Sequence, residues 1–111
     1  MYSITFDLDT DMLQKLYEGD SWRNAYGEVK RILLDEGFSW QQGSVYFGDM
    51  KKIDAASAVT AAQRLAEEIP WFAESVRDIQ MLRIEEKSDL NQTVAKAGRM
   101  AARLRAYEEK S

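Results

Sequence analysis

The sequence predicts an α+β fold in which an antiparallel sheet carries its helices on one face. Three observations predict it: an alternating apolar run at the start of the chain, two segments with helical apolar spacing, and two aromatic runs around one glycine. With 111 residues, 45% of them apolar and 31% charged, the chain is long enough for one compact core and too short for two.

The first expected strand spans residues 2–8. Successive side chains of a strand point to opposite faces. The apolar face consists of Tyr2, Ile4, Phe6 and Leu8, and the polar face consists of Ser3, Thr5 and Asp7. We therefore expect the first face to lie in the core, and Asp7 to project from the side of the sheet that no helix covers.

Two later segments show the three- and four-residue apolar spacing of amphipathic helices. The first is expected to begin at Ser21, which suits an N-cap, and to end near Glu36, where Gly37 suits the left-handed conformation that follows a helix. The second is expected over residues 54–68, because Pro70, the only proline, cannot continue it.

Three further strands complete the expected sheet. Residues 38–42 and 44–47 flank Gly43 and predict a short hairpin. Residues 75–85 predict a fourth strand, whose imperfect alternation suggests a bulge and leaves open which face its arginines take. The order β, α, β, β, α, β is that of the ferredoxin-like fold. One face of such a sheet stays open, and aromatic neighbours on it favour a homodimer.

The last segment, residues 89–107, predicts a further helix with a narrow apolar stripe. The stripe consists of Leu90, Val94, Ala97, Ala101 and Leu104. We expect this helix to pack on its own subunit or on a dimer mate, and the alternative is a docking helix for another protein. The expected organisation is a domain at residues 1–90 followed by a helical extension at residues 91–111.

The composition excludes several kinds of site. The chain has no cysteine, which excludes disulfides, thiol nucleophiles and thiolate metal sites. It has no histidine, which removes the usual general base near neutral pH. A net charge of -4 argues against broad, nonspecific binding of nucleic acid. An enzyme of this composition has to use carboxylates, hydroxyls, Lys or Arg, and we expect a hard cation held by oxygen ligands to assist them.

The chain does not open on a basic segment followed by an apolar one, and no apolar stretch approaches the ~20 residues that a membrane span needs. We therefore expect a cytoplasmic protein that makes no contact with a membrane.

Asp7, Asp9 and Asp11 alternate where the first apolar run stops. A calcium loop is rejected, because Met12 stands where that loop needs glycine. A haloacid dehalogenase-type phosphatase is rejected, because the chain is too short and its elements are in another order. Two interpretations remain: a merely solvated strand end, or a site at which Asp7 and Asp9 hold Mg2+ or Mn2+ against a scissile phosphate.

Several fragments resemble the virulence-associated protein D (VapD) family over roughly residues 1–90. They are Met1-Tyr2, Phe6-Asp7-Leu8-Asp9, Ala25-Tyr26, Gly37-Phe38, Gln42-Gly43-Ser44-Val45-Tyr46, Ser75-Val76-Arg77-Asp78-Ile79 and Arg83-Ile84-Glu85. The resemblance implies a ferredoxin-like homodimer, similar to the small CRISPR-associated nuclease subunits. It also implies an endoribonuclease, in some members the toxin of a toxin-antitoxin pair. The family's acidic residue corresponds to Asp7, and its Gly-Ser-x-Tyr hairpin corresponds to residues 43–46.

The resemblance and the residue types suggest roles for five side chains. Asp7 would bind a cation or act as general base toward a ribose 2'-hydroxyl, near the two-fold axis of the dimer. Ser44 and Tyr46 would hydrogen-bond the phosphate, and Tyr46 would stack on a base. Arg77 or Arg83 would stabilise the charge that builds on the phosphate.

A hypothesis of another class is a non-catalytic dimeric adaptor that binds protein, since fold does not determine function. The acidic net charge, the absence of histidine and the additional helix suit such a protein as well. The sequence leaves open the RNA target, the base preference, the need for a metal and the existence of an antitoxin partner.

Overall fold

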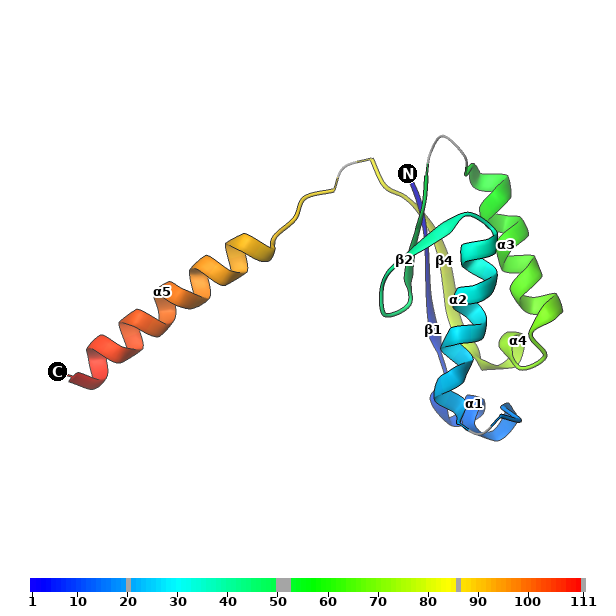
Figure 1. Ribbon diagram of the computed structural model, residues 1–111, viewed down its shortest axis with the longest axis horizontal. Coiled ribbons are helices and arrows are strands. Elements are labelled where there is room, and N and C mark those ends of the chain that lie inside the picture. Colours follow the sequence, from blue (N-terminus) through cyan, green and yellow to red (C-terminus); the bar gives the residue numbers. More distant parts are fainter. Residues whose placement is uncertain (20, 50–52, 86, 111) are drawn as a thin grey trace.

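The computed structural model describes residues 1–19, 21–49, 53–85 and 87–110. Four strands form one antiparallel sheet in the order β2-β3-β1-β4. The strands are β1 (Tyr2–Leu8), β2 (Phe38–Gln42), β3 (Val45–Gly48) and β4 (Val76–Arg83). The two longer helices of the body, α2 (Ala25–Asp35) and α3 (Ala55–Glu68), lie side by side against one face (Figure 1). This arrangement confirms the ferredoxin-like fold that the sequence predicts.

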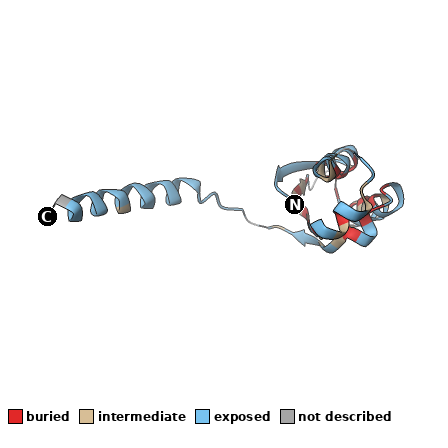
Figure 2. Cartoon of the chain, turned by 90° about the horizontal axis from the view of Figure 1, so that it is seen from below, coloured by how far each residue is buried: buried red, intermediate tan, exposed pale blue. Residues whose placement is uncertain are grey.

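The core lies between the sheet and these two helices (Figure 2). The sheet contributes the apolar face of β1, as expected, and the helices contribute their apolar stripes. Among the larger of these side chains, Val29, Ile32, Leu33 and Leu65 are fully buried, and Ile4 of β1 is buried with them. Burying each of the larger aliphatic side chains contributes about 1.5–3 kcal/mol relative to leaving it exposed. This packing fixes which face of β1 is left for Asp7.

The end of α2 follows the prediction, whereas α2 begins at Ala25, four residues later than expected. Gly37 has a φ of 94°, the left-handed conformation predicted for the residue after α2. Asp54 caps α3, since its Oδ1 accepts hydrogen bonds of 2.8 Å from the backbone N–H and from the hydroxyl of Ser57. Ser21 accepts from the N–H of Arg23 and caps a 3-10 turn, η1 (Trp22–Asn24), that leads into α2.

Two short helices lie outside the sequence-based expectations. They are α1 (Thr10–Leu16), directly after β1, and α4 (Phe72–Ser75), directly before β4. Neither is long enough to establish an apolar period: α1 has one fully buried position, Leu13, and α4 is a single turn. Tertiary packing rather than periodicity holds them in place, because Leu13 and Phe72 both belong to the core.

The bulge expected in the fourth strand lies at its start. The register pairs Asp7 with Asp78 and Leu8 with Val76, so Arg77 is the extra residue of β4. A bulge bends its strand and re-aims side chains. It explains why the alternation of residues 75–85 is imperfect.

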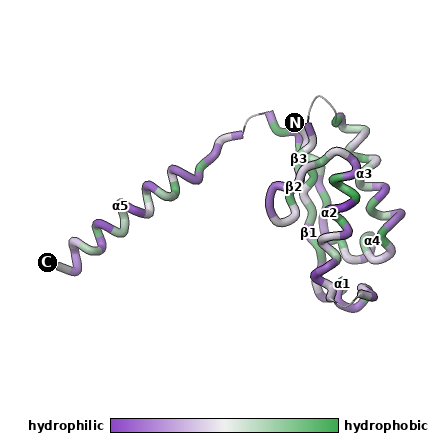
Figure 3. The backbone as a smooth tube through the Cα atoms, viewed as in Figure 1, coloured by the Kyte–Doolittle hydropathy of each residue, from purple (hydrophilic) through white to green (hydrophobic). Residues whose placement is uncertain are grey.

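The last helix, α5 (Asn91–Lys110), extends away from the body (Figures 1 and 2). The expectation that it packs on its own subunit is wrong, because Val94 and Leu104 are 69% and 63% exposed. Two of the five stripe positions are alanine, so the helix has little apolar area to bury against its own domain, and polar and apolar residues alternate along it (Figure 3). Packing on a dimer mate stays a prediction. Within the described residues, no helix combines the length and apolarity that crossing a bilayer requires.

Candidate functional site

Two carboxylates face each other at the end of β1. Asp7 is exposed on the side of the sheet opposite the buried Phe6, as predicted. Its partner across the antiparallel β1–β4 ladder is Asp78, which is exposed as well. Directly opposed residues of such a ladder share a face, with Cβ atoms about 4.5–5.5 Å apart. The structure therefore presents a pair of carboxylates where the sequence suggested one.

Asp78 is the residue that sequence reasoning missed. It lies within the fragment Ser75-Val76-Arg77-Asp78-Ile79, but only its neighbour Arg77 was singled out from that fragment. One carboxylate oxygen, Oδ1, accepts a hydrogen bond of 2.8 Å from the side-chain amide of Gln80 on the same strand and face. That contact orients the carboxylate of Asp78 and leaves its other oxygen free of any described side-chain hydrogen bond.

Asp9, expected beside Asp7 in a cation site, has a structural task. It is the N-cap of α1, and its Oδ1 accepts from the backbone N–H groups of Asp11 and Met12 at 3.0 and 3.2 Å. The guanidinium of Arg77 lies 3.7 Å from the same oxygen. Among the residues that the structure describes, no three acidic side chains are grouped so as to hold a metal ion.

The two arginines occupy opposite ends of β4. Arg77, at the bulge, adjoins Asp78 in sequence, and its side chain is 61% exposed while it contacts Asp9. Arg83 pairs with Glu85 at 3.3 Å and lies across from Tyr2. Arg83 lies five positions along the strand from Asp78, a distance of roughly 17 Å at strand spacing. Arg77 is thus the arginine that the structure brings near the carboxylate pair.

Ser44 and Tyr46 lie on the helix-covered side of the sheet rather than beside Asp7. The carbonyl of Ser44 accepts from the backbone N–H of Phe6 at 3.2 Å, and Tyr46 pairs with Ile4. Tyr46 is 2% exposed and stacks on Phe6 with ring centroids 6.2 Å apart. Burial raises the pKa of its phenol above the ordinary value. The structure therefore does not bring Tyr46 together with Asp7.

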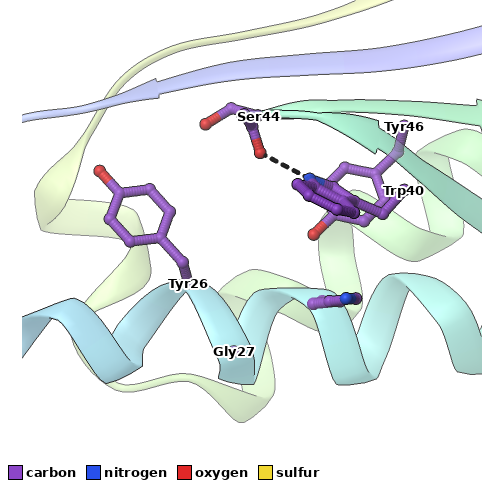
Figure 4. Close-up of a pocket in the computed structure, with 7 residues that line it drawn as sticks. Tyr26, Gly27, Trp40, Ser44 and Tyr46 are labelled. Atoms are coloured by element: carbon purple, nitrogen blue, oxygen red, sulfur yellow. Dashed lines mark hydrogen bonds between the residues drawn. The ribbon is translucent and has the colours of Figure 1, made fainter.

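Ser44 and Tyr46 instead line a pocket of about 440 Å³ between α2 and the β2–β3 hairpin (Figure 4). Aromatic and basic residues to which the sequence analysis assigned no role in a site line the same pocket: Tyr26, Lys30 and Trp40. The indole N–H of Trp40 donates to the carbonyl of Gly43 at 2.9 Å, which fixes the indole ring against the tip of its own hairpin.

The chemistry available at the carboxylate pair is limited and specific. Carboxylate oxygens are preferred ligands of hard cations, and an ionised carboxylate also accepts a proton from a hydroxyl. Arg77 adjoins Asp78 in sequence, and its guanidinium contacts Asp9 at the same end of β4. Its permanent positive charge suits an anionic group such as a phosphate. The arrangement fits phosphate chemistry without histidine.

Comparison with known proteins places this arrangement in a family. The family model described as CRISPR associated protein Cas2 matches residues 1–92. Endoribonuclease VapD 2 of Riemerella anatipestifer is 48% identical over 90 residues, which cover 81% of this chain and 95% of that protein. An endoribonuclease VapD homolog of Helicobacter pylori is 46% identical over 90 residues, which cover 81% of this chain and 92% of that protein.

A third relative, endoribonuclease VapD of Dichelobacter nodosus, is 39% identical over 94 residues, covering 85% of this chain and 97% of that protein. The matched relatives are therefore covered almost from end to end, whereas most of α5 lies beyond the family model. The chain belongs to the Cas2 family and to the VapD family, as the fragments of its sequence predicted.

Proposed function

We propose that this protein is an endoribonuclease that cleaves single-stranded RNA at the Asp7–Asp78 pair. The observation that carries the proposal is the exposed, directly opposed pair of carboxylates on the face that no helix covers. The names of the VapD relatives as endoribonucleases support it.

Asp7 has the central chemical role. In one route Asp7 accepts the proton of a ribose 2'-hydroxyl as this oxygen attacks the adjacent phosphorus, the bond from phosphorus to the 5'-oxygen breaks, and the departing 5'-oxygen takes a proton from water. In the other route Asp7 would ligate a cation, which would supply Lewis acidity toward the phosphate. Arg77 stabilises the charge that builds on the phosphate oxygens. Asp78 would share with Asp7 the binding of the proton or of the cation, because a single positive charge relieves the repulsion between two directly opposed carboxylates.

Mg2+ or Mn2+ fits the donor set, which consists of hard carboxylate oxygens. Asp7 and Asp78 would hold the ion, and it would supply Lewis acidity toward the phosphate. Asp9 is less suited to this task than predicted, because its Oδ1 is already engaged by two backbone N–H groups.

A second copy of the chain suits the open face. Next to the carboxylates this face carries Val45, Phe47 and Leu82, and Leu82 is 48% exposed. A homodimer across this face would bury these apolar side chains and bring two carboxylate pairs toward one axis. A cation between them would offset the added repulsion.

The test is cleavage of single-stranded RNA by purified protein with Mg2+, with Mn2+ and with EDTA. Asp7→Asn and Asp78→Asn keep the shape of the side chain and are expected to lose most of the activity, whereas Asp11→Asn, an exposed neighbour in α1, is expected to keep it. Cleavage that persists in Asp7→Asn would place the chemistry elsewhere. Failure of the native protein to cleave under all three conditions would remove the proposal.

A second candidate function, a protein-binding module, is favoured by α5. Its stripe stays exposed and α5 lies almost wholly outside the part that the family model matches. If an antitoxin protein docks on this stripe, the two functions are compatible: the domain would be the toxic nuclease, and α5 would bind its inhibitor. Retention of an inhibitory partner by the full chain, and its loss in Leu104→Asp, would support this role.

A further inference from the structure

We propose that the pocket between α2 and the β2–β3 hairpin is a subsite that binds a nucleobase of the RNA substrate, with Lys30 on the adjoining phosphate. This inference rests on the proposed ribonuclease function. The pocket volume, about 440 Å³, lies within the range typical of small-molecule sites. Unlike the carboxylate pair, the pocket opens on the helix side of the sheet.

The walls of the pocket suit a flat aromatic ligand. Tyr26 rises from α2 on one side, and Trp40 and Tyr46 stand on the other, with Ser44 between them (Figure 4). Trp40 is 48% exposed, which is unusual for so large an aromatic side chain, and it is held in place by its hydrogen bond to Gly43. Exposed aromatic faces of this kind stack on unpaired bases, and they accept every base because each has a π-face.

A cation stands at the same pocket. The ammonium of Lys30 lies 4.7 Å from the centroid of the Trp40 ring. Within the described residues, no carboxylate lies within ion-pair distance of this ammonium group, which leaves it available to an anionic ligand. The flexible stem of a lysine lets the ammonium turn from the ring to a phosphate when a base covers the ring. An aromatic platform beside a mobile cation is the combination that single-stranded nucleic acid requires.

The pocket and the carboxylate pair adjoin the same end of β1. Ser44 is hydrogen-bonded to Phe6, whose side chain faces the helices, and the next residue, Asp7, faces the open side. Gly43 lines the pocket at the hairpin tip, with a φ of 50° and no atom of a residue beyond its chain neighbours within 4 Å of the position of a Cβ. An RNA strand that passes over this unobstructed tip would place one phosphate at the carboxylates and a neighbouring base in the pocket.

The test separates this subsite from the catalytic proposal by measuring binding without turnover. Short single-stranded RNA carrying 2-aminopurine is titrated into Asp7→Asn protein, with anisotropy reporting affinity and base fluorescence reporting stacking. Trp40→Ala is expected to weaken binding about tenfold and to abolish the quenching of 2-aminopurine, because the stacking platform is gone. Trp40→Phe, which keeps an aromatic face but loses the hydrogen bond to Gly43, is expected to stay within about threefold of the parent.

Lys30→Gln is expected to weaken binding several-fold and to flatten its salt dependence, because one phosphate contact is lost. Arg31→Gln, on the next residue of α2 but outside the pocket wall, is the matched control and should change neither. Unchanged affinity and quenching in Trp40→Ala would overturn the subsite, as would equal losses in Trp40→Phe and Trp40→Ala. Absence of cleavage by the native protein would instead remove the ribonuclease proposal and leave the binding result standing.

Discussion

Asp7 and Asp78 lie directly opposite each other on β1 and β4, on the face of the sheet that no helix covers. Like charges at such a position destabilise an antiparallel pair. The hydrogen bond from Gln80 offsets part of this cost for Asp78. The pair therefore lowers the stability of the fold locally, and the proposed role in RNA cleavage is a reason for its presence.

Asp78→Asn is therefore expected to make the protein more stable while it lowers RNA cleavage. Removing one of the two opposed charges should raise the free energy of unfolding by about 0.2–1 kcal/mol. Urea denaturation at low and at high salt measures this, and the gain should shrink at high salt because the repulsion is screened. A loss of stability in Asp78→Asn would contradict the assignment of repulsion to this pair.

Substitutions of Asp9 distinguish a role in capping α1 from a role in binding a metal ion. Asp9→Ala should lower the free energy of unfolding by about 1 kcal/mol, because the cap of α1 is lost. Asp9→Ser keeps a cap oxygen and should recover most of that stability. If Asp9 only caps, Asp9→Ser also keeps RNA cleavage. A stable Asp9→Ser protein that does not cleave RNA would show instead that Asp9 is needed for activity, as a ligand of the cation would be.

Removal of α5 is expected to leave the domain intact. The helix buries almost none of its side chains, so a protein that ends at residue 90 should unfold at the temperature of the full chain. Thermal denaturation followed by circular dichroism at several protein concentrations measures this. A marked and concentration-dependent drop in the unfolding temperature would show that α5 packs on another copy of the chain.

Asp54 predicts a dependence of stability on pH. Hydrogen bonds from the backbone and hydroxyl of Ser57 lower the pKa of Asp54 in the folded protein. Because the folded pKa lies below the unfolded one, the stabilisation is present above the unfolded pKa, about 4, and is lost as the pH falls through the folded pKa. The difference in unfolding temperature between the native protein and Asp54→Ala should therefore be larger at pH 7 than at pH 2. A difference that is the same at both pH values would exclude the carboxylate as its cause.

Several elements could be predicted because their signals are local. The alternation of residues 2–8 indicates both a strand and its buried face, and Gly37 and Asp54 mark helix ends by their own backbone and side-chain chemistry. The order of these elements then determines the sheet topology, since few arrangements satisfy it. The exposure of Asp7 follows from the same pattern.

The sites depend on contacts between residues far apart in sequence. Whether Asp7 meets Asp78, or Tyr26 meets Trp40 across a pocket, depends on strand register and helix placement, which no local pattern encodes. The bulge at Arg77 shows the sensitivity of such pairings, because a shift of one residue sends a side chain to the other face. The sequence by itself therefore determined the fold, its family and the acidic strand end. Only the tertiary structure decided which second carboxylate joins Asp7, that Asp9 caps a helix, and that α5 leaves the body.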